Sequence, residues 1–209
     1  MFRLFKRTKI EKWEVNLLKN TIQLLPKEYL SLEKQIIDGL HRGVREDSNY
    51  IQGYVSFSLD GKLVEKFENK KDREYKITDI KVFDKKSKNY LKYSIYVYNG
   101  LIVGYSIEGA ENFNIDESNI DIEKFKKEYR VNKDYEKLEK YLTSAEKLVI
   151  NRNEVYEVLL NDKTYFHIMD LEDGDFIGMD YEKNLYEITH DPFGIRLINR
   201  TLQEVFQSK

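Results

Sequence analysis

Apolar side chains recur at helical spacing through the first forty residues of the chain. Between residues 10 and 25 they fall every three or four positions, which places them on one face of a helix. Pro26 ends that helix or opens the next one, because proline lacks the amide hydrogen that a helix interior requires. The spacing resumes over residues 27–40. The pattern therefore predicts an N-terminal helix pair, followed by a loop over residues 41–45.

From residue 50 the apolar positions alternate with polar ones, which is the period of a half-buried strand. One alternating run ends at Leu59, and a second apolar run covers residues 63–67, with Asp60-Gly61 between them. Asp-Gly favours a two-residue hairpin turn because both residues tolerate positive φ. The sequence predicts a hairpin here that places Phe57 opposite Val64.

A second dipeptide of this kind, Asn99-Gly100, lies between two long apolar runs. A two-residue turn at this point pairs Val97 with Ile102. Residues 75–83 also alternate and predict a further strand. The first half of the chain is therefore expected to form an antiparallel sheet beside the two helices.

The second half begins with a charged segment, residues 121–149, that returns to helical spacing, with a break expected near residues 131–133. Short apolar runs then alternate with polar turns, which predicts a meander of strands at 154–160, 165–171, 176–179 and 185–189. Thr201 followed by Glu204 is a capping-box pattern, and it predicts a short C-terminal helix.

These elements define an α+β fold: antiparallel β-sheets built from hairpins, an N-terminal helix pair, a central charged helical segment and a short C-terminal helix. At 209 residues the chain can bury one sizeable core, so residues 1–209 are expected to form a single domain. Residues 109–118 are polar and irregular and mark a possible soft boundary. The absence of cysteine excludes disulfides, thiolate metal sites and a cysteine nucleophile.

The charge balance restricts the class of partner. The chain carries 35 Lys and Arg against 37 Asp and Glu, a net charge of -2, which argues against nucleic-acid binding through bulk charge. The basic N-terminus lacks the apolar segment of a signal peptide, because Glu11 and Lys12 follow Ile10 directly. No apolar run reaches the roughly 18 residues of a membrane-spanning helix. We therefore expect a cytoplasmic protein without a nucleic-acid or membrane partner.

The three histidines, His41, His167 and His190, are the first candidates for chemistry. The last two lie in the predicted meander near Asp170 and Asp191, and a histidine paired with a carboxylate can transfer protons or bind a metal. Both uses need a third converging group, which the sequence does not identify. The run from Asp170 does not fit a calcium loop, because its glycine falls at position 5 instead of 6. We expect no catalytic residue, metal ligand or cofactor.

The same region is strongly acidic. From Asp170 to Asp191 the chain carries eight acidic residues and one basic residue, Lys183, a local charge of -7 with neutral histidines. Solvated turns explain such a cluster, and so does a docking surface for a basic partner. Sixteen tyrosines favour the second interpretation, because tyrosine is common in protein interfaces. Its contact residues are then Glu172, Asp173, Asp175, Asp180, Tyr181, Glu182 and Glu187.

The last forty residues resemble the end of the SMI1/KNR4 (SUKH) superfamily in three segments: Gly174-Asp-Phe-Ile-Gly-Met-Asp180, Leu185-Tyr-Glu-Ile-Thr-His-Asp191 and Ile198-Asn-Arg-Thr-Leu-Gln-Glu-Val-Phe206. Leu25-Pro-Lys-Glu-Tyr29 is similar to the Leu-Pro-x-x-Tyr start of that family. The resemblance implies an α+β domain. It also implies a bacterial immunity protein that binds and neutralises a cognate toxin, or a scaffold-like interaction module.

The resulting hypothesis is a non-enzymatic binding module that occludes its partner, a basic toxin domain, through the acidic turns. One alternative is a metal-dependent hydrolase that uses the acidic and histidine cluster at residues 167–191, with Asp170, Asp173, Asp175, His167 and His190 as its ligands or acid/base groups. The other is a regulatory scaffold of the same fold. The sequence leaves the oligomeric state and the identity of the partner open.

Overall fold

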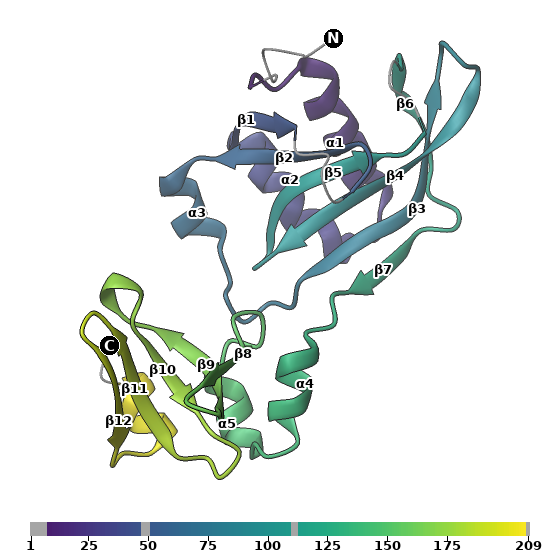
Figure 1. The fold of residues 1–209 in the computed structure, drawn as a ribbon. Coiled ribbons are helices and arrows are strands. Elements are labelled where there is room, and N and C mark those ends of the chain that lie inside the picture. Colours follow the sequence, from purple (N-terminus) through teal and green to yellow (C-terminus); the bar gives the residue numbers. More distant parts are fainter. Residues whose placement is uncertain (1–7, 47–50, 110–112, 208–209) are drawn as a thin grey trace. The chain divides into compact units, whose positions relative to one another are not determined.

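The computed structural model describes residues 8–46, 51–109 and 113–207 (Figure 1). The described residues form six α-helices and twelve strands, and every strand pairing is antiparallel, which confirms the expected α+β class. The chain divides into two compact units, Met1–Arg130 and Val131–Lys209. No helix in the described part of the chain is long and apolar enough to cross a membrane.

The first unit begins with the predicted helix pair, α1 (Lys12–Leu24) and α2 (Leu30–Ile37). Pro26 separates the two helices and leads into the short 3-10 turn η1 (Lys27–Tyr29). The apolar stripe of α1 is buried completely at Leu18 and Ile22. The helix pair was predictable because each helix carries its own periodic stripe and proline marks the junction.

A seven-stranded sheet forms the rest of the first unit, in the order β1-β2-β5-β4-β3-β6, with β7 paired to the other end of β3. The helices lie over one face of this sheet (Figure 1), and the core of the unit lies between them. The strands are β1 (His41–Glu46), β2 (Tyr54–Leu59), β3 (Tyr75–Asp84), β4 (Asn89–Tyr98), β5 (Leu101–Ile107), β6 (Ile115–Asp121) and β7 (Lys126–Tyr129).

The Asn99-Gly100 hairpin is confirmed, including its register. Both residues have positive φ, 47° and 76°, and Val97 pairs with Ile102 across β4 and β5. A turn of this kind depends on two residues that tolerate the left-handed region, so the dipeptide alone specifies it.

The prediction of a hairpin at Asp60-Gly61 is wrong. Asp60 caps the short helix α3 (Gly61–Phe67) instead, with its side chain accepting hydrogen bonds from the backbone amides of Lys62 and Leu63. An aspartate before a glycine serves a helix N-terminus as well as a hairpin, because both uses satisfy local backbone groups. The partner of Phe57 is Val44 in β1, so the loop expected over residues 41–45 is also wrong.

The charged segment 121–149 is only partly helical. Its first residues belong to β6 and β7, which pair with β3, and α4 (Lys133–Glu139) and α5 (Ser144–Val149) follow. The expected break at residues 131–133 falls at the start of the second unit, before α4. The described residues 113–118 belong to the first unit, because the pairing of β6 with β3 holds this part of the chain to the first sheet.

The second unit contains the predicted meander, a five-stranded sheet in the order β12-β11-β10-β9-β8. Helices α4, α5 and α6 contribute side chains to the core on one face of it. Thr201 and Glu204 form the predicted capping box before α6. The remaining elements are β8 (Tyr156–Leu160), β9 (Lys163–Asp170), the 3-10 turn η2 (Glu172–Gly174), β10 (Phe176–Met179), β11 (Leu185–His190), β12 (Phe193–Ile198) and α6 (Leu202–Gln207).

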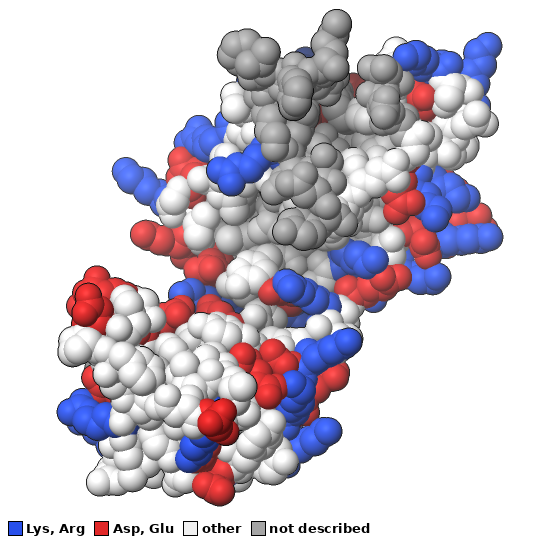
Figure 2. Space-filling model, in the orientation of Figure 1, with Lys and Arg blue, Asp and Glu red and all other residues white. Residues whose placement is uncertain are grey.

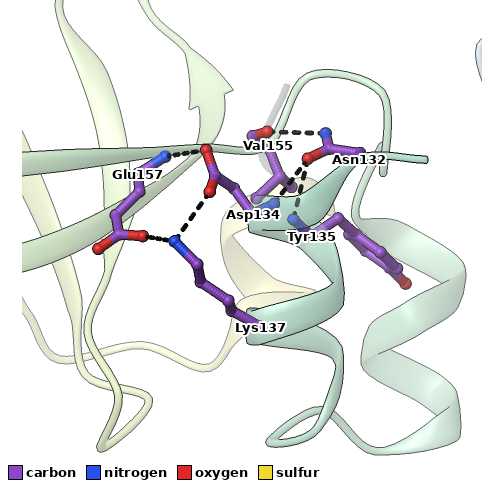
Figure 3. Close-up of polar contacts among 6 residues, drawn as sticks. All are labelled: Asn132, Asp134, Tyr135, Lys137, Val155 and Glu157. Carbon is purple, nitrogen blue, oxygen red and sulfur yellow. Dashed lines mark hydrogen bonds and ion pairs between the residues drawn. The ribbon is translucent and has the colours of Figure 1, made fainter. Parts of the chain in front are cut away.

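A polar network fastens α4 to the start of the sheet (Figure 3). The side-chain oxygen of Asn132 accepts from the amides of the first helical turn, and its amide nitrogen donates to the carbonyls of Arg152 and Val155, at 2.7 and 2.8 Å. Asp134 accepts from the amide of Glu157 at 3.2 Å, and Lys137 pairs with the carboxylates of both. A single asparagine therefore starts the helix and positions it against the strand that follows.

Candidate partner-binding site

Seven residues were predicted from the sequence to contact a partner. One of them, Asp180, is buried, with 2% of its surface exposed. Its carboxylate accepts from the amides of Glu182 and Asn184, from the hydroxyl of Tyr186, and pairs with Lys163 at 2.8 Å. Burial raises the pKa of Asp180, but the hydrogen bonds from Lys163 and Asn184 outweigh it and lower the pKa below its ordinary value. Asp180 therefore organises the turn and is not available to a partner.

Two other predicted contact residues, Asp175 and Glu187, have partners on neighbouring strands. Asp175 accepts from the backbone amide and ring Nδ1 of His190, at 3.0 and 2.7 Å, and these bonds lower its pKa. Glu187 pairs with Arg196 across β11 and β12. The local charge of -7 is thus partly neutralised by bases that lie outside the acidic stretch in the sequence, Lys163 and Arg196.

The remaining four contact residues are exposed, and they lie at two ends of β10. Glu172 and Asp173 lie in η2, before the strand, and neither makes an ion pair with another described residue. Tyr181 and Glu182 lie in the turn after it, and the ring of Tyr181 packs edge-on against Phe166 in the core of the unit. Four residues of strand span about 14 Å. The acidic turns therefore form two separate sites and not one cluster.

The histidines do not converge on a metal. His167 is 1% exposed, its Nε2 lies 2.9 Å from Asp170, and its Nδ1 lies 3.0 Å from the carbonyl of Glu154. His190 pairs with Asp175, and His41 belongs to the first unit. Among the described residues no group of three or more His, Asp and Glu side chains could hold a metal ion.

The outer face of the second sheet is a feature that the sequence interpretation missed. We use this name for the face opposite α4, α5 and α6. The register assigns it Lys163, Asp170 and thirteen positions that are uncharged or histidine: Tyr156, Val158, Leu160, Tyr165, His167, Phe176, Gly178, Tyr186, Ile188, His190, Phe193, Ile195 and Leu197. The signal in the sequence was the lack of polar residues at alternate positions of β9 to β12, where a solvated face normally carries them.

A second surface, a hollow of about 600 Å³, lies in the first unit. Five tyrosines line it: Tyr54, Tyr75, Tyr96, Tyr98 and Tyr129. Its charged side chains are already paired, Glu74 with Arg130 at 2.8 Å and Lys76 with Glu128 at 2.9 Å. The hollow offers ring faces, but its charges neutralise one another and do not select a charged ligand.

The described structure therefore defines an α+β protein with two antiparallel sheets. Comparison of the chain with protein-family models, with curated proteins and with solved structures found no match.

Proposed function

We propose that this chain is a protein-binding module of the immunity type, which neutralises a basic toxin domain in the bacterial cytoplasm by covering its active surface. The resemblance of the C-terminal segments to the SUKH superfamily motivates this function. Binding by occlusion requires no catalytic residue.

The observation that carries the proposal is the exposed acidic turn η2. Glu172 and Asp173 present carboxylates to solvent without an ion pair among the described residues. The turn around them is fixed, because the amide of Leu171 donates to the carbonyl of Asp175 and the Asp175 side chain is held by His190. Fixed like charges steer a partner of opposite charge and cost little ordering free energy on binding.

The two alternatives have less support. A metal-dependent hydrolase needs converging ligands, whereas His167 and His190 each bind a different carboxylate. A regulatory scaffold would use the same surfaces with a different partner, so it differs from the immunity proposal in the identity of that partner and not in the structure.

The test is a binding measurement between the full chain and the product of the neighbouring gene, together with the survival of cells that express that product. We expect binding that weakens as salt increases, because the exposed carboxylates act through a screened field. Asp173→Lys should slow association, whereas the matched control Glu65→Lys, an exposed acid on α3 in the first unit, should not. If the chain neither binds this product nor protects the cells that express it, the proposal is refuted.

A further inference from the structure

We infer that the outer face of the second sheet is the docking surface, and that its occupant is a protein whose contact patch is apolar and bordered by lysine or arginine side chains. This inference rests on the proposed binding function and adds the surface and the chemistry of the partner. Three properties of the outer face support it: its composition, its rigidity and the sign of the charge at its border.

The composition of the outer face is that of an interface core. Its edge strands expose large side chains, with 48% of Tyr156, 56% of Phe193 and 51% of Leu197 accessible. A sheet with one solvated face normally alternates apolar and polar residues, and a contiguous apolar face marks a binding surface. Two charged side chains lie on this face: Lys163 is neutralised by Asp180, and Asp170 lies opposite Phe176 at the end of the face next to η2. The side of the second unit turned to the viewer in Figure 2 is largely uncharged, with acidic side chains at its upper edge and both acidic and basic side chains elsewhere on it.

The centre of the outer face is tightly packed. Tyr165 and Ile188 are 4% and 3% exposed although the described helices of the unit pack on the other face. Tyr165 and Tyr186 meet edge-on with ring centroids 5.1 Å apart. A Cβ on Gly178 would lie 2.8 Å from the Cδ1 of Ile188, so the glycine lets the neighbouring side chains close over the strand. Rings held in this way lose little conformational entropy when a partner covers them.

The border of the outer face is acidic where it meets η2. Asp170 and Asp175 join this turn to the face through their hydrogen bonds with His167 and His190. The exposed acids of the turn itself then lie beside the aromatic surface. An apolar centre with a charged rim is the usual anatomy of a protein interface, and an acidic rim matches a basic partner.

The experiment compares two leucines of the same unit that lie on edge strands but on opposite faces. Leu197 belongs to the outer face, and Leu159 in β8 belongs to the face that carries the helices, with 69% of its surface exposed. The affinity of the full chain for the product of the neighbouring gene is measured by titration calorimetry for the wild type, Leu197→Glu and Leu159→Glu. We expect Leu197→Glu to weaken binding at least about thirty-fold, as for an interface hot spot, and Leu159→Glu to stay within about three-fold. Circular dichroism verifies that both variants are folded.

The outcomes distinguish a failure of the proposed docking surface from a failure of the proposed function. If the wild type binds and Leu197→Glu binds equally well, the outer face is not the docking surface, while the proposed function stands. Equal weakening by both leucine variants overturns the inference in the same way. If the wild type does not bind, the proposed function fails and the partner assignment fails with it. Sedimentation velocity tests a different occupant of the outer face. A wild-type dimer that Leu197→Glu converts to a monomer would assign the face to a second copy of the chain and overturn the inference.

Discussion

The protonation of His41 should make the first unit unstable in acid. The Nε2 of this histidine lies 3.0 Å from the carbonyl oxygen of Ile102, and its ring packs against Phe57 with centroids 4.6 Å apart. Burial lowers the pKa of His41 to about 4, although the hydrogen bond to Ile102 partly offsets this effect. The ordinary pKa of an unfolded histidine is about 6.5.

The sign and size of the effect follow from these values. Above pH 6.5 the imidazole is neutral in both states and the unfolding free energy does not depend on it. Between pH 6.5 and 4 the unfolded chain binds a proton that the folded chain excludes, so the unfolding free energy falls as the pH falls. A pKa difference of about 2.5 units at 1.36 kcal/mol per unit amounts to about 3 kcal/mol. Below about pH 4 the folded state is protonated as well and the effect levels off.

Urea unfolding at several pH values measures this loss. Trp13 is the single tryptophan and packs edge-on against Tyr105 and Phe113, so its fluorescence reports the first unit. The variant His41→Gln keeps an amide donor for Ile102 but has no titrating group. The difference between wild type and variant should change by about 3 kcal/mol from pH 7 to 4, whereas His190→Gln, which lies in the second unit, should leave the Trp13 signal unchanged. Parallel pH profiles for wild type and His41→Gln would refute the reasoning, as would an NMR-measured pKa near 6.5.

Three further predictions concern the two units. Gly104→Ala should lower the unfolding free energy of the first unit by about 1–3 kcal/mol in urea, because the new Cβ would lie 2.5 Å from the carbonyl oxygen of Val55; Gly61→Ala, with no atom within 4 Å, is the control and should change it little. Asn132→Ala should destabilise the second unit by about 2 kcal/mol through the loss of a helix cap and two hydrogen bonds, and Asn132→Ser, which keeps the cap acceptor, should cost less; equal losses would contradict the double role of the side chain. Residues 131–209 expressed alone should give a dispersed NMR spectrum, because this unit has its own core; a collapsed spectrum would show that it depends on the rest of the chain.

The sequence by itself determined the elements that depend on local interactions. The stripes of α1 and α2, the Asn99-Gly100 turn and the capping box at Thr201 each involve residues within a few positions of one another. Their chemistry favours one local structure, so the pattern was sufficient to place them. The α+β class and the C-terminal meander followed from the order of these elements.

Tertiary structure decided the features that depend on distant partners. Asp60 suits a hairpin and a helix cap equally, and only the pairing of β2 with β1 and β5 selects the cap. Residues 121–129 carry the spacing of a helix, but the edge of β3 that β4 leaves free pairs with them as parts of strands β6 and β7. Backbone hydrogen bonding to an available edge overrides a weak local preference.

The candidate site shows the same division. Sequence located the acidic turns and the two histidines of the meander. It could not reveal that Lys163 neutralises Asp180 or that Arg196 meets Glu187, because those partners lie on neighbouring strands. Nor could it show that thirteen uncharged or histidine residues share one face, since this depends on the register of five strands. Whether a charged side chain is paired or free depends on its neighbours in space, and these neighbours are set only when the strands of the sheet pair.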